Sequence, residues 1–219
     1  MFRFARVFGS ISIDFMKKAT KKQRWTVQKA LPYILLITGF VALMASFILT
    51  LDHIQLIKDP SFKPSCSINP VLSCGSVMES KQAQTFGFPN PIIGIAVFGA
   101  QVMLGVVLLA GAKLKKWFWQ LFGLNLLANV GFTVWLMHAS FFEIKALCIY
   151  CMTTWVMVLT SSWYTFQFML AEDLIDIKNP KVKEFLRVHH LDILVAIFVV
   201  IILFVLHEFW YYYKQFFTF

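Results

Sequence analysis

Long apolar runs separated by short polar stretches dominate the pattern of this chain. Five runs have about the length that a helix needs to cross the roughly 30 Å hydrocarbon core of a bilayer. The fifth is the weakest, because Asp192 and Glu208 bound a short apolar stretch and must lie near the interfaces. The pattern predicts an all-α polytopic membrane protein, with a four-helix transmembrane bundle and a fifth transmembrane helix. The five runs cover residues 31–51, 91–112, 117–142, 146–171 and 191–210.

Polar segments divide the chain around these spans. Residues 1–30 are basic and mildly amphipathic, which predicts a segment lying on the cytoplasmic membrane surface. Residues 31–171 would form the catalytic core, with the one sizeable loop at 52–90. A cytoplasmic loop at 172–190 and the fifth helix with a short outer tail at 191–219 would follow. Pro32 suits the first turn of the first span, and Asn69 predicts a loop helix that begins at Pro70.

Charge predicts the orientation of these spans. Of the 219 residues, 59% are hydrophobic and only 14% are charged, and the formal net charge is +9. With the N-terminus inside, the inner segments hold fifteen of the 20 Lys and Arg residues. This positive-inside bias predicts a cell-membrane protein whose 52–90 loop and 142–147 turn face the extracytoplasmic side. Membrane anchoring also accounts for the basic charge, so no nucleic-acid partner is predicted.

The four cysteines fall into two close pairs. Cys66 and Cys74 lie in the loop, and Cys148 and Cys151 form a Cys-x-x-Cys motif at the head of the fourth span. On the predicted topology both pairs face the oxidising side, where disulfides persist. The pattern predicts a two-stage thiol relay, with an exposed, mobile loop pair and a second pair fixed beside an acceptor. The alternative is that Cys148 and Cys151 are ordinary small apolar residues, since free Cys packs well.

The sequence shows no motif for a protein-bound group that could accept the electrons of such a relay. The chain has no Gly-rich dinucleotide motif, haem Cys-x-x-Cys-His motif or iron–sulfur cysteine run. A quinone dissolved in the bilayer fits instead. Asn90 at the mouth of the second span and Trp155 in the fourth are candidates for its pocket, although such residues also serve packing. His53 and His138 could assist proton release or be solvated interface residues.

The residues resemble the vitamin K epoxide reductase family over about residues 31–171. The resemblance implies a four-helix bundle that encloses a quinone and is capped by the loop helix. A fifth span is known in bacterial members, and some carry a fused thioredoxin-like domain after it; this chain ends at Phe219 without one. The matching elements are Cys66-x7-Cys74, Ser80, Asn90-Pro-Ile-Ile-Gly94 and Cys148-Ile-Tyr-Cys151-Met-Thr-Thr-Trp155.

The resemblance implies a role for each cysteine. Cys66 would exchange with a partner thiol–disulfide protein, Cys74 would relay to Cys148, and Cys151 would be the sulfur nearest the quinone. The DsbB family performs the same reaction, but its Cys-x-x-Cys pair precedes the loop pair in sequence. Here the loop pair comes first, which favours the vitamin K epoxide reductase family.

The resemblance also implies the pocket residues. Asn90 matches a position that hydrogen-bonds a quinone oxygen, and Ser80 matches a serine near the pocket. Trp155 stands where animal members have Tyr, so the resemblance implies no particular quinone preference.

The predicted function is a membrane thiol oxidoreductase that supports disulfide bond formation. Electrons would pass from an extracytoplasmic thioredoxin-like (DsbA-like) oxidase, acting in trans, through both cysteine pairs to menaquinone, ubiquinone or a phylloquinone-like quinone. One alternative is an animal-type vitamin K epoxide reductase that draws electrons from a lumenal thiol protein. Another is a zinc-binding or structural membrane protein. No metal site is predicted, because zinc ligand pairs are usually two to four residues apart and Cys66-x7-Cys74 is not.

Overall fold

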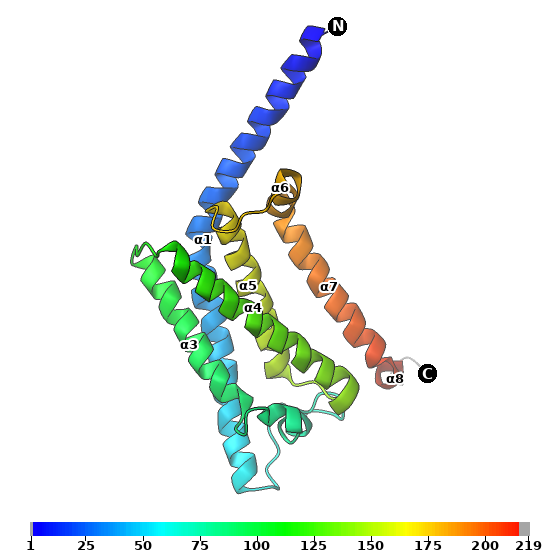
Figure 1. Cartoon of the computed structure of the whole chain (residues 1–219). Helices are drawn as coiled ribbons and strands as arrows, with labels where there is room; N and C mark the ends of the chain where they lie inside the picture. Colours follow the sequence, from blue (N-terminus) through cyan, green and yellow to red (C-terminus); the bar gives the residue numbers. More distant parts are fainter. Residues whose placement is uncertain (1, 215–219) are drawn as a thin grey trace.

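The computed structural model is a bundle of long helices (Figure 1). It describes the backbone of residues 2–214 and the side chains of residues 27–212 and 214. No β-strand occurs in this described part, so the prediction of an all-α polytopic protein is confirmed. In chain order the elements are α1 (Phe2–Lys58), α2 (Cys74–Met78), the 3-10 helix η1 (Lys81–Gln84), α3 (Asn90–Leu109), α4 (Lys116–His138), the π-helix η2 (Ala139–Ile144), α5 (Ile149–Ala171), α6 (Pro180–Val188), α7 (His190–Glu208) and α8 (Trp210–Tyr213).

Four stretches among the described residues are long and apolar enough to cross a membrane. They are Val27–Lys58, Asn90–Leu109, Lys116–Ile144 and His190–Glu208. The last of these agrees with the predicted fifth span. The four stretches match the first, second, third and fifth predicted spans. The fourth predicted span corresponds to α5, whose mean hydropathy is too low to meet the same criterion.

Polar side chains explain why α5 is less apolar than its neighbours. The hydroxyls of Thr153, Thr154 and Ser161 donate to carbonyl oxygens of the preceding turn of the same helix. These bonds satisfy the hydroxyls without water, as a membrane interior requires. α5 runs alongside α1 and α4 from the loop end of the bundle to the opposite end (Figure 1). Its 23 residues extend about 34 Å, which is enough to cross a bilayer.

α1 extends beyond the predicted first span at both ends. The helix is continuous from Phe2 to Lys58, so Pro32 lies inside it instead of in its first turn. Proline is tolerated within transmembrane helices because neighbouring helices compensate for the backbone group that it frees. The backbone at the N-terminal end projects away from the bundle, at an angle to the rest of α1 (Figure 1). The apolar and basic side chains of residues 1–26 lie outside the described ones, so a surface-lying segment stays a prediction.

Small residues let α1 and α3 approach closely. A Cβ placed on Gly94 would come within 2.5 Å of Ser46 Oγ, and one on Gly105 within 3.0 Å of backbone atoms of Pro32 and Leu36. Between these two contacts, the buried Gln101 side chain donates to Thr38 Oγ1 (2.9 Å) and to a carbonyl of α1. The two glycines therefore occupy the close-packing positions that small residues favour in membrane helices.

Gly105→Ala is expected to destabilise the bundle although alanine favours helix over glycine. The new methyl group would press on the α1 backbone, which cannot move without displacing the helix, and we expect a loss of about 1–3 kcal/mol. Gly99→Ala is the matched control on the same helix, because a Cβ there meets nothing within 4 Å. It should leave stability unchanged or raise it by up to about 1 kcal/mol. Unfolding in mixed micelles measures both, and equal stabilities would contradict the packing.

Candidate active site

Two backbone hydrogen bonds join the loop to the segment that precedes α5. The N–H of Leu147 donates to the carbonyl of Val71 (2.7 Å), and the N–H of Ser73 donates to the carbonyl of Leu147 (2.9 Å). They form an isolated parallel bridge centred on Leu72 and Leu147. Cys148 follows the bridge directly on one side, and the loop cysteine of α2 follows it closely on the other. The bridge therefore brings the two cysteine pairs together although they are far apart in sequence.

The loop helix begins later than its sequence predicts. Asn69 Oδ1 accepts the N–H groups of Val71 (2.9 Å) and Leu72 (2.7 Å), as an N-cap would, but no helix starts there. The reason is the bridge, which uses the next backbone groups in extended pairing. The helix α2 begins only at Cys74, after Ser73, whose side chain accepts the N–H of Ser76 (3.3 Å). The prediction of a helix starting at Pro70 was wrong by four residues.

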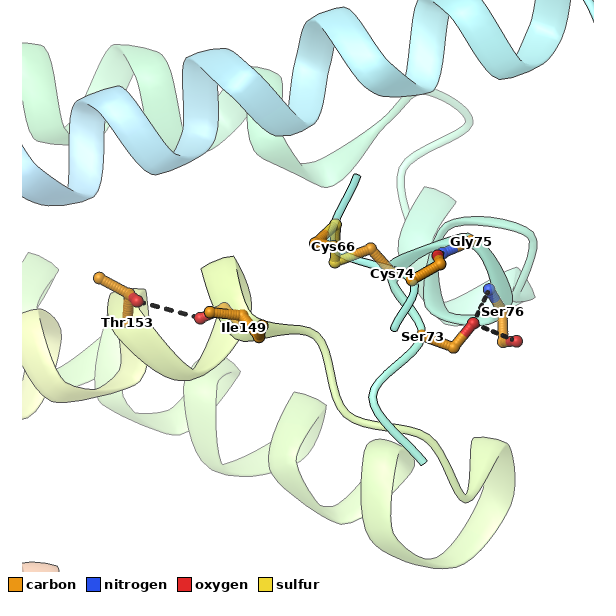
Figure 2. The surroundings of a disulfide bond; sticks show 8 residues. Cys66, Ser73, Cys74, Gly75, Ser76, Ile149 and Thr153 are labelled. Carbon is orange, nitrogen blue, oxygen red and sulfur yellow. Dashed lines mark hydrogen bonds between the residues drawn. A yellow bond between two sulfur atoms is a disulfide. The ribbon is translucent and has the colours of Figure 1, made fainter. Parts of the chain in front are cut away.

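Cys66 and Cys74 form a disulfide (Figure 2). Their Cα atoms are 5.6 Å apart, a usual span for such a bond. The turn that carries Cys66 is held against α2 because the N–H of Gly75 donates to Ser67 Oγ (3.1 Å). Figure 2 shows the disulfide between the α2 cap on one side and the first turn of α5, marked by Ile149, on the other.

Three sulfur atoms meet at this point. The Sγ atoms of Cys66, Cys74 and Cys148 all lie within 4.8 Å of one another. Cys148 and Cys151 are free thiols, and Cys148 stands at the N-cap of α5. The positive end of a helix dipole stabilises a thiolate, and the thiolate is the nucleophile in disulfide exchange. The geometry therefore suits transfer between the disulfide and Cys148.

The loop pair is buried, which corrects the prediction that it is exposed and mobile. Cys66 is 5% exposed and Cys74 is fully buried. Both pack with Leu49 of α1, Met78 of α2 and Cys148 in one apolar cluster. The expected exposure was wrong because the loop crosses the end of the bundle (Figure 1) and its apolar side chains pack against α1 and α5 there. A macromolecular partner can reach this disulfide only after the cluster opens.

A cavity of about 130 Å³ lies beneath the sulfur cluster, within the bundle. Its size is comparable with that of protein cavities that accept a single aromatic ring, so a quinone head group entering from its open side is compatible with it. Its wall is mostly apolar with a few polar side chains, as is usual for small-molecule sites. Besides Cys148 and Cys151, the lining includes Ser46, His53, Ser80, Gln82, Asn90, Phe98, Asn129, Phe132, Thr133, Ser140, Thr154 and Trp155.

The three predicted pocket residues all line this cavity. Trp155 is buried and meets the ring of Phe141 edge to face, with centroids 5.9 Å apart. Ser80 Oγ donates to the carbonyl of Val77 (2.7 Å) and accepts the N–H of Ala83 (3.2 Å), so this serine caps η1. The structure thus gives Ser80 an evident local task in shaping the loop above the cavity.

Asn90 also binds the loop. Its Nδ2 donates to the carbonyl of Gln82 (2.6 Å), and its Oδ1 accepts the N–H of Thr85 (3.2 Å). The amide nitrogen has a second hydrogen, which leaves one donor for a ligand. Asn90 therefore joins the start of α3 to the cap while keeping the capacity that its predicted role requires.

Sequence reasoning missed several polar residues of the cavity and misjudged one histidine. His53 was described as near the outer surface, yet it is 2% exposed and lines the cavity. Only the spacing of α1 could have indicated that His53 faces the same side as the buried Ser46 and Leu49. Ser140 lies in the π-helix η2, which brings it to the cavity wall. No local pattern in the sequence predicts this helix.

The helices and the sulfur cluster define a polytopic membrane protein of the thiol oxidoreductase type. A sequence model of the vitamin K epoxide reductase family matches residues 33–166. This chain belongs to that family. It is also 26% identical over 106 residues to mouse vitamin K epoxide reductase complex subunit 1, a match that covers 45% of this chain and 65% of the mouse protein. The chain thus spans just under two thirds of the length of this curated relative.

Proposed function

We propose that this protein is a quinone-linked thiol oxidase that supports disulfide bond formation. The observation that supports it most is the arrangement of Cys66, Cys74 and Cys148 within 4.8 Å of one another, beside a cavity that Cys148 and Cys151 line. A disulfide and a thiol pair so placed can exchange electrons without movement of a whole helix. The cavity lies where a small hydrophobic acceptor can reach the inner pair.

The relay begins at the loop disulfide. A thiol of a reduced partner attacks Cys66, which breaks the Cys66–Cys74 bond and leaves Cys74 as a thiolate. The second partner thiol attacks the mixed disulfide, so the partner leaves oxidised and Cys66 leaves as a thiol. Because Cys66 is buried, this step requires the loop to open first.

The second stage passes the two electrons inward. The Cys74 thiolate attacks Cys148 of an oxidised Cys148–Cys151 pair and releases the Cys151 thiolate. Cys66 then attacks the Cys74–Cys148 bond, which restores the Cys66–Cys74 disulfide and leaves two thiols at the inner pair. In the structure the loop pair is bonded and the inner pair is free, which is the arrangement that this step would produce.

A quinone held in this cavity would supply an acceptor for two electrons and two protons. Cys148 and Cys151 supply the electrons as their disulfide forms. Asn90 has one amide hydrogen left to donate to the ligand, and the buried ring of Trp155 supplies an apolar wall. The mostly apolar wall limits the access of water to the thiols.

The partner is a thioredoxin-fold oxidase acting in trans on the extracytoplasmic side. Support comes from the excess of Lys and Arg in the segments at the opposite end of the bundle, which favours placing the cysteine end outside. Thiol exchange with a small redox protein also suits a disulfide on a loop better than one inside a helix.

Reconstituted protein tests this function. The full chain in nanodiscs receives a reduced thioredoxin-fold oxidase as donor and menadione as acceptor, and loss of partner thiols is followed together with quinone absorbance. Two partner thiols should be lost for each quinone that is reduced. Cys66→Ala should abolish the reaction with the partner but retain menadione reduction driven by dithiothreitol. A Cys66→Ala protein that oxidises the partner at the wild-type rate would contradict the order of the relay.

The second candidate function is reduction of vitamin K epoxide. The name of the mouse relative favours it, and the same four sulfurs could supply the two electrons. Turnover of vitamin K epoxide with dithiothreitol, compared with turnover of menadione, separates the two candidates. Zinc binding at the three clustered sulfurs would need the disulfide reduced first, and metal analysis of reduced protein tests it.

A further inference from the structure

The cavity wall contains one ionisable side chain besides the two thiols. Among the described residues that line it, His53 is this side chain, and there is no Asp, Glu, Lys, Arg or Tyr. α2, η1, α3, α4 and η2 contribute only apolar, hydroxyl and amide groups. The ionisable side chains among the described residues of the cavity wall are therefore Cys148, Cys151 and His53.

The environment of His53 is unusual for a histidine with only a structural task. It lies one turn beyond Leu49 on α1 and is 2% exposed. Its Nε2 is 3.0 Å from Nε2 of Gln84 in η1, and its Nδ1 is buried with no hydrogen-bond partner in the described part of the chain. An unpaired buried nitrogen costs about 1–3 kcal/mol, so its presence needs a reason.

Because Gln84 contacts Nε2, Nδ1 is the ring nitrogen that is left to exchange a proton. The Gln84 amide can donate to Nε2, which places the ring proton on Nδ1, or accept from Nε2 after a flip, which leaves Nδ1 bare. Both tautomers thus keep a partner at Nε2. A ring that is supported in both forms can take up a proton and release it at Nδ1 without losing its anchor on the cap.

We propose that His53 carries a proton between the Cys148–Cys151 thiols and the quinone oxygen. This inference rests on the proposed function. When the inner pair is oxidised, the two thiols lose two electrons and two protons and form one S–S bond. His53 accepts one of these protons and delivers it to the quinone, so the imidazole ends as it began. The quinone gains two electrons and two protons in total, which balances the reaction.

The charged neighbours of His53 allow this role. Asp52, the adjacent residue of α1, acts electrostatically on Cys148 and has one buried carboxylate oxygen without a partner among the described residues. Cys148 and Cys151 face the cavity from the head of α5. Glu143 of η2 accepts a hydrogen bond from the lining residue Gln82, but the described residues that line the cavity include no Asp, Glu, Lys or Arg. The pH dependence of thiol oxidation should therefore report mainly on these four groups.

His53→Gln, with His207→Gln as the matched control, tests the inference. His207 receives the same substitution, its side chain is 83% exposed, and it does not line the cavity. Single-turnover oxidation of the reduced inner pair by menadione should slow by about a hundredfold in His53→Gln at pH 7, as is usual when general acid–base help is lost. The deficit should shrink as pH rises, because hydroxide then removes the thiol protons. His207→Gln should stay within about threefold of wild type.

Two measurements besides turnover separate the outcomes. The equilibrium between the Cys66–Cys74 and Cys148–Cys151 disulfides, set with glutathione and read by alkylation, should be unchanged in His53→Gln because no quinone takes part. The ¹⁵N signal of His53 Nδ1 should shift when menadione binds wild-type protein. If wild type does not reduce menadione, the proposed function fails. If wild type does so and His53→Gln has the same rate and pH profile, only the role of His53 is overturned.

Discussion

A Cys66→Ala/Cys151→Ala double variant is expected to form a Cys74–Cys148 disulfide in most molecules on mild oxidation. The two sulfurs already lie within 4.8 Å, and small side-chain rotations bring them to the bond length of about 2.05 Å. The removed cysteines are the two that would otherwise resolve this bond. Non-reducing electrophoresis after proteolysis, with mass spectrometry of the linked peptides, measures the yield.

The matched control keeps the same number of cysteines. Cys66→Ala/Cys148→Ala leaves Cys74 with Cys151, which lies inside α5 beyond the bridge-held segment. It should cross-link at least about tenfold more slowly, because the helix would have to unwind or shift to close the gap. Equal rates in both double variants would show that the loop moves freely over the head of α5, and the proposed relay through Cys74 and Cys148 would lose its structural basis.

Cys148→Ala is expected to reduce electron transfer to the quinone by at least about a thousandfold, as removal of a reacting group usually does. The inner pair can then no longer form a disulfide, so two electrons cannot leave together. The loop pair should accumulate as thiols when reduced partner is supplied, because nothing accepts electrons from Cys74. Stopped-flow quinone absorbance and alkylation of Cys66 and Cys74 measure the two effects.

Thr153→Ala on the next turn of α5 is the control for this variant. Its hydroxyl bonds only to the Ile149 carbonyl of its own helix, and it does not line the cavity. Its rate should lie within about twofold of wild type. If Cys148→Ala protein reduced the quinone at the wild-type rate, the electrons would have to follow another route. That result would exclude the assigned order of sulfurs.

Much of the fold could be predicted because membrane helices are encoded locally. Apolar runs of bilayer length exclude every spanning structure except helices and closed barrels, since each backbone group must be satisfied within the membrane. The positions of α1, α3, α4 and α7 follow directly from that rule. α5 was predicted from its lack of charge, and the backbone hydrogen bonds of its hydroxyls explain how a less apolar sequence can occupy the bundle.

Features that depend on contacts between distant residues could not be predicted. The bridge at Leu72 and Leu147 joins segments 75 positions apart, and it overrode the local helix signal at Asn69 and Pro70. Burial of Cys66 depends on apolar partners from α1 and α2 in the same way. The burial of His53 was missed for the same reason, because its contact with Gln84 joins residues 31 positions apart.

By itself, the amino-acid sequence determined the apolar helices, the two cysteine pairs and the family resemblance, because hydropathy and motif spacing are properties of neighbouring residues. Only the tertiary structure decided that three sulfurs meet within 4.8 Å, that the loop disulfide is buried and that His53 joins the thiols at one cavity. Those results depend on the bridge and on the packing of the loop over the bundle, which pair residues that no local pattern relates.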